Sequence, residues 1–225
     1  MKPLFIAVEG PIGIGKTTIS TELAASFNAF LLKEIVEENP FLEKFYNDPE
    51  HWAFQTEIFF LCNRYKQLEK VEQVLEQDNI VISDYHIFKN LLFAKRTLNE
   101  KDFKKYEHLF KTLLDGLPKP DIVIYSNASI DTLLSRIKKR GRIIEKGIDP
   151  EYLKQLSMDY KESFSSINTF LPGTSVLEID GDSVDFVANP EKMNDLSNEL
   201  QALIKEHQSN PDKQHYRKFT GNKKS

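Results

Sequence analysis

Short runs of consecutive apolar residues recur along the chain and predict buried strands. They occupy residues 4–8, 30–32, 80–83, 121–125 and 175–179. Each run is rich in β-branched or aromatic side chains, which favour strands. Within a run apolar residues follow one another without alternating with polar ones. This pattern is typical of strands covered on both faces of a sheet.

Segments with helical periodicity separate these runs. They cover residues 16–27, 50–77, 86–115 with a break, 129–140, 149–170 and 189–206. Strands that alternate with helices predict a parallel sheet joined by right-handed crossovers. The sequence therefore predicts an α/β fold, a five-stranded parallel sheet with helices on both faces. We expect one domain over residues 1–206, followed by a basic, flexible tail at 207–225.

Length and composition exclude several classes of protein. The 225 residues include 40% hydrophobic residues, enough for a large core and too many for a disordered chain. A single cysteine excludes a disulfide framework and a thiolate metal cluster. No apolar run approaches the roughly 20 residues of a membrane-spanning helix. The start MKPLFIAVEG turns polar too soon for a signal peptide. We expect a cytoplasmic protein.

Charge is distributed unevenly along the chain. The net charge is −4 overall, although residues 208–225 carry +4. The preceding residues are therefore strongly acidic, a poor match for a phosphate backbone. The basic residues of the tail are Lys213, Arg217, Lys218, Lys223 and Lys224. They could contact RNA or DNA, but a frayed terminus is the simpler explanation and the one we expect.

Residues 10–17 carry the strongest motif, Gly-Pro-Ile-Gly-Ile-Gly-Lys-Thr, which matches G-x-x-x-x-G-K-[ST]. A predicted strand precedes it and a predicted helix follows, as a phosphate-binding loop requires. Backbone N–H groups of such a loop surround phosphate oxygens, and the helix start adds a positive dipole end. The expected nucleotide-binding residues are Gly10, Gly13, Ile14, Gly15, Lys16, Thr17 and Thr18. The alternative is a glycine-rich turn with a chance lysine.

Two of these side chains have specific expected roles. Lys16 would reach the β- and γ-phosphates, and Thr17 would place its hydroxyl on Mg²⁺. Asp84 follows the strand 80–83, at the edge of the sheet where ligands of open α/β folds bind. We expect Asp84 to hold the same Mg²⁺, directly or through water. An N-cap of the following helix is the alternative role for Asp84.

An arginine-rich segment follows the fourth strand. Arg136 and Arg140 lie four residues apart on one helix face, Gly141 would end that helix, and Arg142 follows it. Guanidinium groups on such a loop can close over a transferring phosphoryl group and neutralise its charge. We expect a lid here. A solvated basic helix end is the alternative.

Two charged residues interrupt an apolar stripe in the long helix 50–77. Phe54, Glu57, Leu61, Arg64 and Leu68 follow a spacing of three and four residues, so they share one face. A buried charge needs a partner or a ligand. Glu57 and Arg64 are therefore candidate ligand-binding residues. An internal Glu57–Arg64 ion pair or a solvent-facing stripe would equally explain the pattern.

Five segments together resemble the deoxyribonucleoside kinase family, in particular its bacterial deoxyguanosine/deoxyadenosine kinase branch. They read GPIGIGKTT, EIVEENPFLEKFYNDPEHW, ISDYHIFKN, RIKKRGRIIEKGI and DGDSVDF. The resemblance covers about residues 1–206. It implies an ATP- and Mg²⁺-dependent P-loop kinase, usually a homodimer, that phosphorylates the 5′-hydroxyl of a deoxynucleoside.

The resemblance also assigns residue roles by matching position. Glu34 resembles the general base, with an exposed glutamate in an acidic run as its alternative. Tyr46 and Glu145 match residues that hold the sugar 3′-hydroxyl, and Glu57 with Arg64 match the pair that reads the base. The remaining matches are the lid arginines Arg136, Arg140 and Arg142, with Arg140 and Arg142 near the γ-phosphoryl group, and Asp185 and Phe186 beside the adenine of the donor.

Two departures from the family pattern change the expectations. The acidic residue after the third strand is often followed by arginine, whereas Tyr85 and His86 follow Asp84. A lid arginine is our candidate replacement. The base-reading position is commonly glutamine, whereas this chain has Glu57. An ionised carboxylate accepts two hydrogen bonds side by side, which suits the N1–H and N2–H₂ groups of guanine. Arg64 would donate to O6 or N7. The sequence therefore predicts deoxyguanosine as the acceptor.

Other functions remain open at this point. A nucleoside monophosphate kinase or a deoxyadenosine or broader deoxynucleoside kinase would share most of these features. A GTPase-like switch would usually carry an N-K-x-D segment late in the chain, and this sequence has none. A nucleic-acid-binding module would depend on the basic tail.

Overall fold

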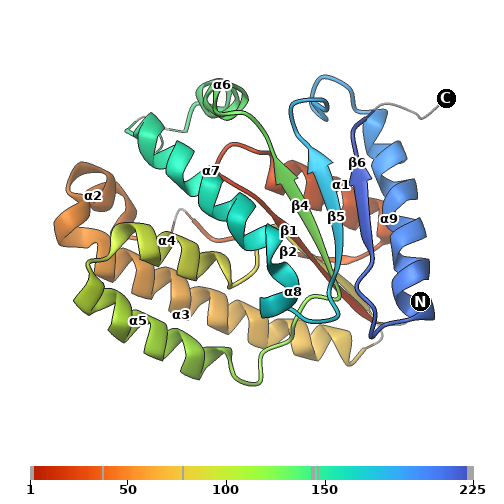
Figure 1. Ribbon diagram of the computed structural model, residues 1–225, viewed down its shortest axis with the longest axis horizontal. Helices are drawn as coiled ribbons and strands as arrows, with labels where there is room; N and C mark the ends of the chain where they lie inside the picture. The colour runs from red at the N-terminus through yellow and green to blue at the C-terminus, as the bar shows by residue number, and fades with distance from the viewer. Residues whose placement is uncertain (1–2, 37, 78, 143–144, 146, 222–225) are drawn as a thin grey trace.

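The computed structural model describes residues 3–221 except 37, 78, 143, 144 and 146. Its strands form one parallel sheet with helices on both faces (Figure 1). The strands are β1 (Leu4–Glu9), β2 (Phe30–Leu32), β3 (Ile80–Ser83), β4 (Ile122–Asn127), β5 (Ser175–Asp180) and β6 (Tyr216–Phe219), in the sheet order β2-β3-β1-β4-β5-β6. The predicted α/β class is confirmed, with one more strand than expected.

The helices divide between the two faces of the sheet. They are α1 (Lys16–Phe27), α2 (Leu42–Asn47), α3 (Pro49–Leu75), α4 (Lys89–Thr97), α5 (Glu100–Leu114), α6 (Ile130–Arg140), α7 (Pro150–Ser165), α8 (Ile167–Phe170) and α9 (Lys192–Ser209). Apolar residues of α1 and α9 pack on one face. Those of α3, α5 and α7 cover the other, which faces the viewer in Figure 1.

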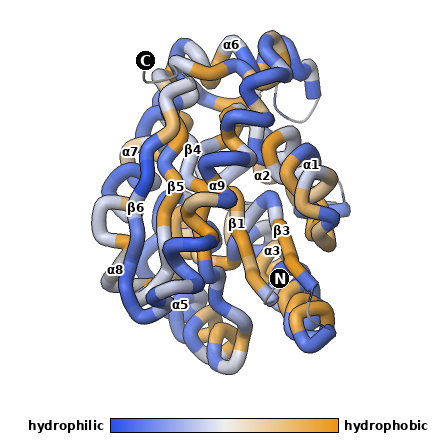
Figure 2. The backbone as a smooth tube through the Cα atoms, turned by 90° about the vertical axis from the view of Figure 1, so that its right-hand side faces the viewer, coloured by the Kyte–Doolittle hydropathy of each residue, from blue (hydrophilic) through white to orange (hydrophobic). Residues whose placement is uncertain are grey.

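The sheet is most hydrophobic at its centre. Every residue of β1 and β3 is buried, and both strands are orange in Figure 2. The short strand β2 differs from the expectation of burial on both faces, because it lies at the edge of the sheet and Phe30 is 43% exposed. A central strand needs cover on two faces, whereas an edge strand can leave one side chain in water.

The C-terminal segment folds back onto the sheet, which differs from the flexible tail expected at residues 207–225. Helix α9 continues to Ser209, and β6 pairs in parallel with β5. Arg217 holds β6 by ion pairs of 2.6 and 2.7 Å to Glu199 and Glu206 of α9. The charge of Arg217, which suggested a solvated tail, therefore attaches β6 to α9. Lys223 and Lys224 lie outside the described residues.

Side chains after several strands meet at one edge of the sheet. Ser83 pairs in register with Ala7 of β1 and with Leu32 of β2, so the chain leaves these strands at a similar height. Glu34 and Asp84 follow directly, beside the glycine-rich loop after β1. This edge is where open parallel sheets bind ligands. Within the described ranges, no helix has the length and apolarity to cross a membrane.

Candidate active site

The glycine-rich loop has the strand–loop–helix geometry that its motif requires. Gly10 and Gly13 have φ angles of +149° and +88°, which side-chain-bearing residues rarely adopt. A Cβ atom on Gly10 would lie 2.2 Å from the carbonyl oxygen of Ser126. One on Gly13 would lie 2.8 Å from the carbonyl oxygen of Leu133. The loop therefore packs against β4 and α6 in a way that only glycine permits.

Lys16 bends back over this loop. Its ammonium donates hydrogen bonds to the carbonyl oxygens of Gly10, at 2.8 Å, and Pro11, at 3.1 Å. Burial lowers the pKa of Lys16 to about 8, and the positive charge of Lys89 lowers it further. An anion in the loop would oppose both effects by stabilising the charged ammonium, so the side chain is suited to bind phosphate.

Thr17 and Asp84 bring two oxygen ligands together. The hydroxyl of Thr17 donates to Asp84 Oδ2 over 2.9 Å, and Asp84 Oδ1 accepts from the backbone N–H of Glu34 over 2.6 Å. Burial and the charge of Glu34 raise the pKa of Asp84. Because α4 begins at Lys89, Asp84 is not the N-cap of that helix, which removes the structural alternative.

Glu34 lies inside the site between two cations. Its side chain is only 12% exposed, so it is not a surface glutamate. Lys89 donates to both carboxylate oxygens, at 2.8 and 2.9 Å, and Arg64 forms an ion pair with Oε1. Burial alone would raise the pKa of Glu34, but the charges of Lys89 and Arg64 outweigh it and hold the pKa well below its usual range.

Arg64 is also held by a chain of hydrogen bonds through Asn90 to Tyr106. Its Nη1 donates to Asn90 over 2.6 Å, and Asn90 Nδ2 lies 2.8 Å from the hydroxyl of Tyr106. The guanidinium also lies over the ring of Phe60, 4.7 Å from its centroid. Arg64 Nε is buried and has no hydrogen-bond partner among the described residues. The guanidinium has five N–H donors, so donors other than those on Glu34 and Asn90 remain for a ligand.

Glu57 is a second buried carboxyl group in the same cavity. It is 3% exposed, and Thr97 Oγ1 lies 3.1 Å from its Oε1. In the described part of the chain Glu57 and Arg64 form no ion pair, so the internal pair that the spacing also allowed is absent. Burial raises the pKa of Glu57 to about 7 against the lowering effect of Arg64. Such an acid needs hydrogen-bond donors from a ligand to ionise fully.

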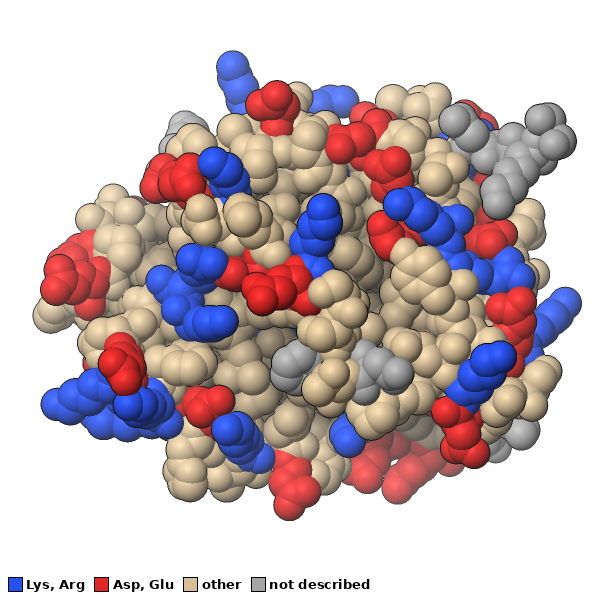
Figure 3. Space-filling model, in the orientation of Figure 1, with Lys and Arg blue, Asp and Glu red and all other residues tan. Residues whose placement is uncertain are grey.

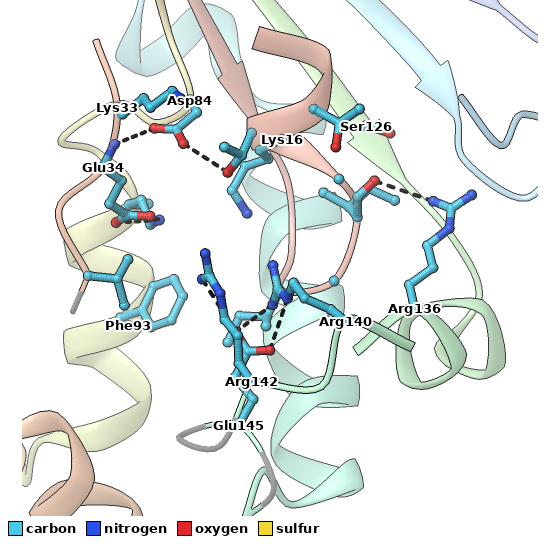
Figure 4. Close-up of a pocket in the computed structure, with 18 of the residues that line it drawn as sticks. Lys16, Lys33, Glu34, Asp84, Phe93, Ser126, Arg136, Arg140, Arg142 and Glu145 are labelled. Atoms are coloured by element: carbon cyan, nitrogen blue, oxygen red, sulfur yellow. Dashed lines mark hydrogen bonds and ion pairs between the residues drawn. The ribbon is translucent and has the colours of Figure 1, made fainter. Parts of the chain in front are cut away.

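The lid arginines are paired with Glu145. Arg140 contacts both carboxylate oxygens of Glu145, with Nε at 3.1 Å, and Arg142 lies 3.7 Å from it. Burial and the negative charges of Glu145 and Glu57 raise the pKa of Tyr46, which lines the same cavity. Figure 4 shows Arg140 and Arg142 across the cavity from Glu34, with Lys16 pointing into the same space.

Arg136 has a different environment from the other two arginines. It donates to the carbonyl oxygens of Ile14, Gly181 and Val184, at 3.3, 2.8 and 2.9 Å. It therefore joins α6 to the glycine-rich loop and to the segment 181–187. In that segment the Asp185 carboxylate accepts hydrogen bonds from the backbone N–H groups of Val187 and Ala188. These bonds hold the backbone of the segment in a turn.

One cavity of about 700 Å³ collects these groups. Every site residue expected from the sequence lines it except Gly10, whose carbonyl accepts from Lys16. The cavity is larger than a single nucleoside needs and suits a donor and an acceptor side by side. On the face drawn in Figure 3, acidic and basic side chains are interspersed, an unfavourable surface for nucleic acid.

Sequence reasoning missed Lys89, Asn90 and Thr97. All three come from α4, and their side chains reach Glu34, Arg64 and Glu57. Lys89 and Asn90 lie in the segment ISDYHIFKN, but a lysine at the start of a helix gives no pattern that distinguishes it from a surface residue. The one available signal for Lys89 was the absence of an arginine after Asp84, because that absence implies a cation at another position of the site.

Comparisons with known proteins identify relatives across nearly the whole chain. The deoxynucleoside kinase family model matches residues 6–205. A deoxyguanosine kinase of Bacillus subtilis (strain 168) is 48% identical over 201 residues, which cover 89% of this chain and 97% of the relative. A deoxyguanosine kinase of Lactobacillus johnsonii is 33% identical over 89% of this chain and 92% of the relative.

A solved structure also resembles this fold. The deoxyadenosine kinase from M. mycoides, with dCMP and a flexible dCDP bound, superposes with a TM-score of 0.75. It is 31% identical in sequence and covers 88% of this chain and 100% of that protein.

Proposed function

This chain belongs to the deoxynucleoside kinase family, and from that premise we propose that it transfers the γ-phosphate of ATP to the 5′-hydroxyl of deoxyguanosine. Kinases of this family use ATP as phosphate donor. The similarity to two deoxyguanosine kinases supports the choice of acceptor, and the cavity supplies an independent physical reason.

The donor binds on the glycine-rich side of the cavity. Gly13, Gly15 and Lys16 hold the phosphates, and Asp185 with Phe186 lies beside the adenine. The oxygens of Thr17 and Asp84, 2.9 Å apart, are hard ligands that suit Mg²⁺. Two protein ligands leave the other positions to phosphate and water, as Mg²⁺ sites in kinases require. When bound, the ion neutralises charge on the phosphates.

Glu34 receives the acceptor hydroxyl. Its carboxylate lies at the cavity wall, near Lys16 and the phosphate-binding loop. The bond from O5′ to the γ-phosphorus forms while the bond from that phosphorus to the β,γ-bridging oxygen breaks. The hydroxyl proton passes to Glu34, and ADP leaves. Because its pKa is held low, Glu34 acts mainly by orienting the hydroxyl and takes the proton late in the transfer.

The buried carboxylate of Glu57 is the observation that carries the choice of guanine. It accepts hydrogen bonds from N1–H and N2–H₂ of guanine, which lie side by side. Arg64 donates to O6 or N7 of guanine through an N–H group that binds neither Glu34 nor Asn90. Adenine offers no such pair of donors and would leave a buried carboxylate unsatisfied, a large penalty.

The lid and the sugar site share Glu145. Tyr46 and Glu145 hold the 3′-hydroxyl of deoxyribose, while Glu145 pairs with Arg140 and Arg142. Engagement of the sugar therefore changes the partners of the two arginines that face the γ-phosphoryl group. Closure of the lid excludes water from the transfer.

A substrate panel tests the acceptor. With purified protein, kcat/KM is measured for deoxyguanosine, deoxyadenosine, deoxycytidine and deoxyguanosine 5′-monophosphate, for wild type and Glu57→Gln. We expect wild type to favour deoxyguanosine and the variant to lose about ten- to a hundredfold of that preference over deoxyadenosine. An unchanged ratio would remove Glu57 from base selection, and preferred turnover of the monophosphate would contradict the proposed acceptor.

Deoxyadenosine is the second candidate, because a deoxyadenosine kinase of Dictyostelium discoideum is 34% identical over 172 residues. The same panel decides between the two purines. We also propose a homodimer in the cytoplasm, in keeping with the family. Light scattering after size-exclusion chromatography should give twice the chain mass of 26.1 kDa.

A further inference from the structure

The cation that the family pattern leads one to expect after Asp84 is missing from the sequence, and Tyr85 does not supply a substitute. The Tyr85 side chain is fully buried, and its hydroxyl donates to Gln67 over 2.6 Å. His86 is also buried, and burial lowers its pKa to about 3, so it stays neutral. A positive charge beside Glu34 must come from another position.

Lys89 meets that requirement. It is the first residue of α4, is 5% exposed and lines the cavity. Its ammonium is 2.8 and 2.9 Å from the two oxygens of Glu34, so it bridges the carboxylate symmetrically. Its positive charge also lowers the pKa of Lys16, second to the effect of burial. A buried ammonium without such a partner would be costly.

The two cations on Glu34 differ in what they fix. Arg64 contacts only Oε1, through Nη2, and is itself anchored by Asn90 through Nη1. Lys89 contacts both oxygens and thereby fixes the rotation of the carboxylate plane. Without Lys89 the carboxylate keeps one anchor and can turn about its terminal bond. The expected consequence is loss of alignment with the acceptor hydroxyl and a rise in the pKa of Glu34.

The lid arginines do not take this place. Arg140, at the end of α6, and Arg142, in the segment after it, both interact with Glu145. Glu34 pairs instead with residues from α3 and α4. The cation beside Glu34 therefore comes from α3 and α4, while a lid arginine stays our candidate for the role of the missing arginine at the phosphates.

We propose that Lys89 is the positioning residue of the acceptor side, which holds the Glu34 carboxylate ionised and aimed at the 5′-hydroxyl. The inference rests on the proposed function, because it gives Lys89 a role in the same transfer. Lys89 moves no proton and forms no bond to phosphorus. It acts through Glu34.

Kinetics of four variants test this role. Lys89→Met removes the charge and keeps the side-chain length, Lys89→Arg restores a cation, and Glu34→Gln and the double variant complete a cycle. Lys95→Met, on the exposed side of the same helix, is the matched control. Thermal unfolding and binding of deoxyguanosine are measured for each, so that a folding defect is separated from a catalytic one.

The expected pattern is specific. Lys89→Met lowers kcat about a hundredfold and changes the KM for deoxyguanosine less than about fivefold, because alignment is lost rather than binding. The acid limb of its kcat profile moves to higher pH, since Glu34 has lost a neutralising charge. Lys89→Arg recovers most of the rate. In the Glu34→Gln background, Lys89→Met costs less than about threefold.

Opposite results overturn the inference. A near-normal kcat with an unmoved acid limb in Lys89→Met, or full additivity with Glu34→Gln, would show that Lys89 does not act through Glu34. If Lys89→Met fails to fold, Lys89→Arg provides the test instead. The acid limb of its kcat profile should stay at the wild-type pH, and a shift of that limb would contradict the inference. A wild-type protein that phosphorylates no deoxynucleoside would instead refute the proposed function.

Discussion

The two halves of the cavity are built in opposite ways. The half that we propose for the donor uses consecutive residues, 10–18, whose backbone N–H groups and glycine conformations suit a phosphate. The acceptor half uses buried charges from distant segments: Glu34 after β2, Glu57 and Arg64 on α3, and Lys89 on α4. A common triphosphate can be held by a local backbone motif. Selection and alignment of one acceptor require side chains that only the fold brings together.

The strongest test of this contrast removes the charge at the centre of the acceptor half. We expect Glu34→Gln to lower kcat about a hundred- to ten-thousandfold, because the amide cannot take the proton and leaves two buried cations unneutralised. The deoxyguanosine dissociation constant, measured by calorimetry, should change far less. Glu38→Gln, an exposed neighbour, serves as control. A near-normal kcat would remove Glu34 from the reaction.

In the donor half, a change that disturbs the backbone of the glycine-rich loop should weaken ATP binding. We expect Gly13→Ala to raise the KM for ATP about ten- to a hundredfold, because the new Cβ meets Leu133 and φ is +88°. Deoxyguanosine binding without nucleotide should be retained. Gly116→Ala is the matched control, since Gly116 has φ of +79° in open space. Equal losses of donor and acceptor binding would show that the halves are not independent.

Dependence on pH should separate the halves further. Burial raises the pKa of Glu57 to about 7, above its unfolded value, so its neutral form is favoured below pH 7 in the empty site. Folding stability from this group is present below about pH 4.5 and is lost as pH rises towards 7. Guanine binding requires the opposite, ionised form.

With saturating ATP, kcat/KM for deoxyguanosine should therefore fall about tenfold for each unit below pH 7. Glu57→Gln should flatten this profile, because the amide does not titrate in the range. A wild-type profile that is already flat between pH 5.5 and 7 would contradict the role of Glu57 in reading guanine.

The smallest effect concerns the added strand. The ring of Phe219 in β6 stacks on Phe186, with centroids 6.3 Å apart. Phe186 belongs to the segment where we propose that the donor adenine binds. We expect Phe219→Ala to raise the KM for ATP about two- to tenfold and to leave the KM for deoxyguanosine unchanged. Tyr216→Ala, an exposed aromatic residue of the same strand, is the control. Unchanged ATP kinetics in Phe219→Ala would leave β6 without influence on the donor half.

The same contrast explains what the sequence allowed us to predict. The central strands and the glycine-rich loop have continuous local patterns, and the structure contains them at nearly the expected bounds. Strand β6 has two charges in four residues and joins the sheet through Glu199 and Glu206 of α9, contacts that no local pattern encodes.

Among the site residues, Glu34 and Glu57 were found through resemblance and helical spacing, but their partners were not. The spacing left an Arg64–Glu57 ion pair open as an alternative, whereas in the structure Arg64 binds Glu34 and Asn90. Lys89 gave no signal of its own. Buried charges choose partners by distance in the fold, and 30 or 55 residues separate Glu34 from the two cations that hold it.

A crystal structure with deoxyguanosine and a non-hydrolysable ATP analogue tests the account most directly. It should have O5′ about 3 Å from a carboxylate oxygen of Glu34, between that residue and the γ-phosphate, with guanine N1 and N2 on Glu57. A nucleoside bound with its O5′ directed away from Glu34, or with its base on the opposite side of the cavity from Glu57, would contradict it.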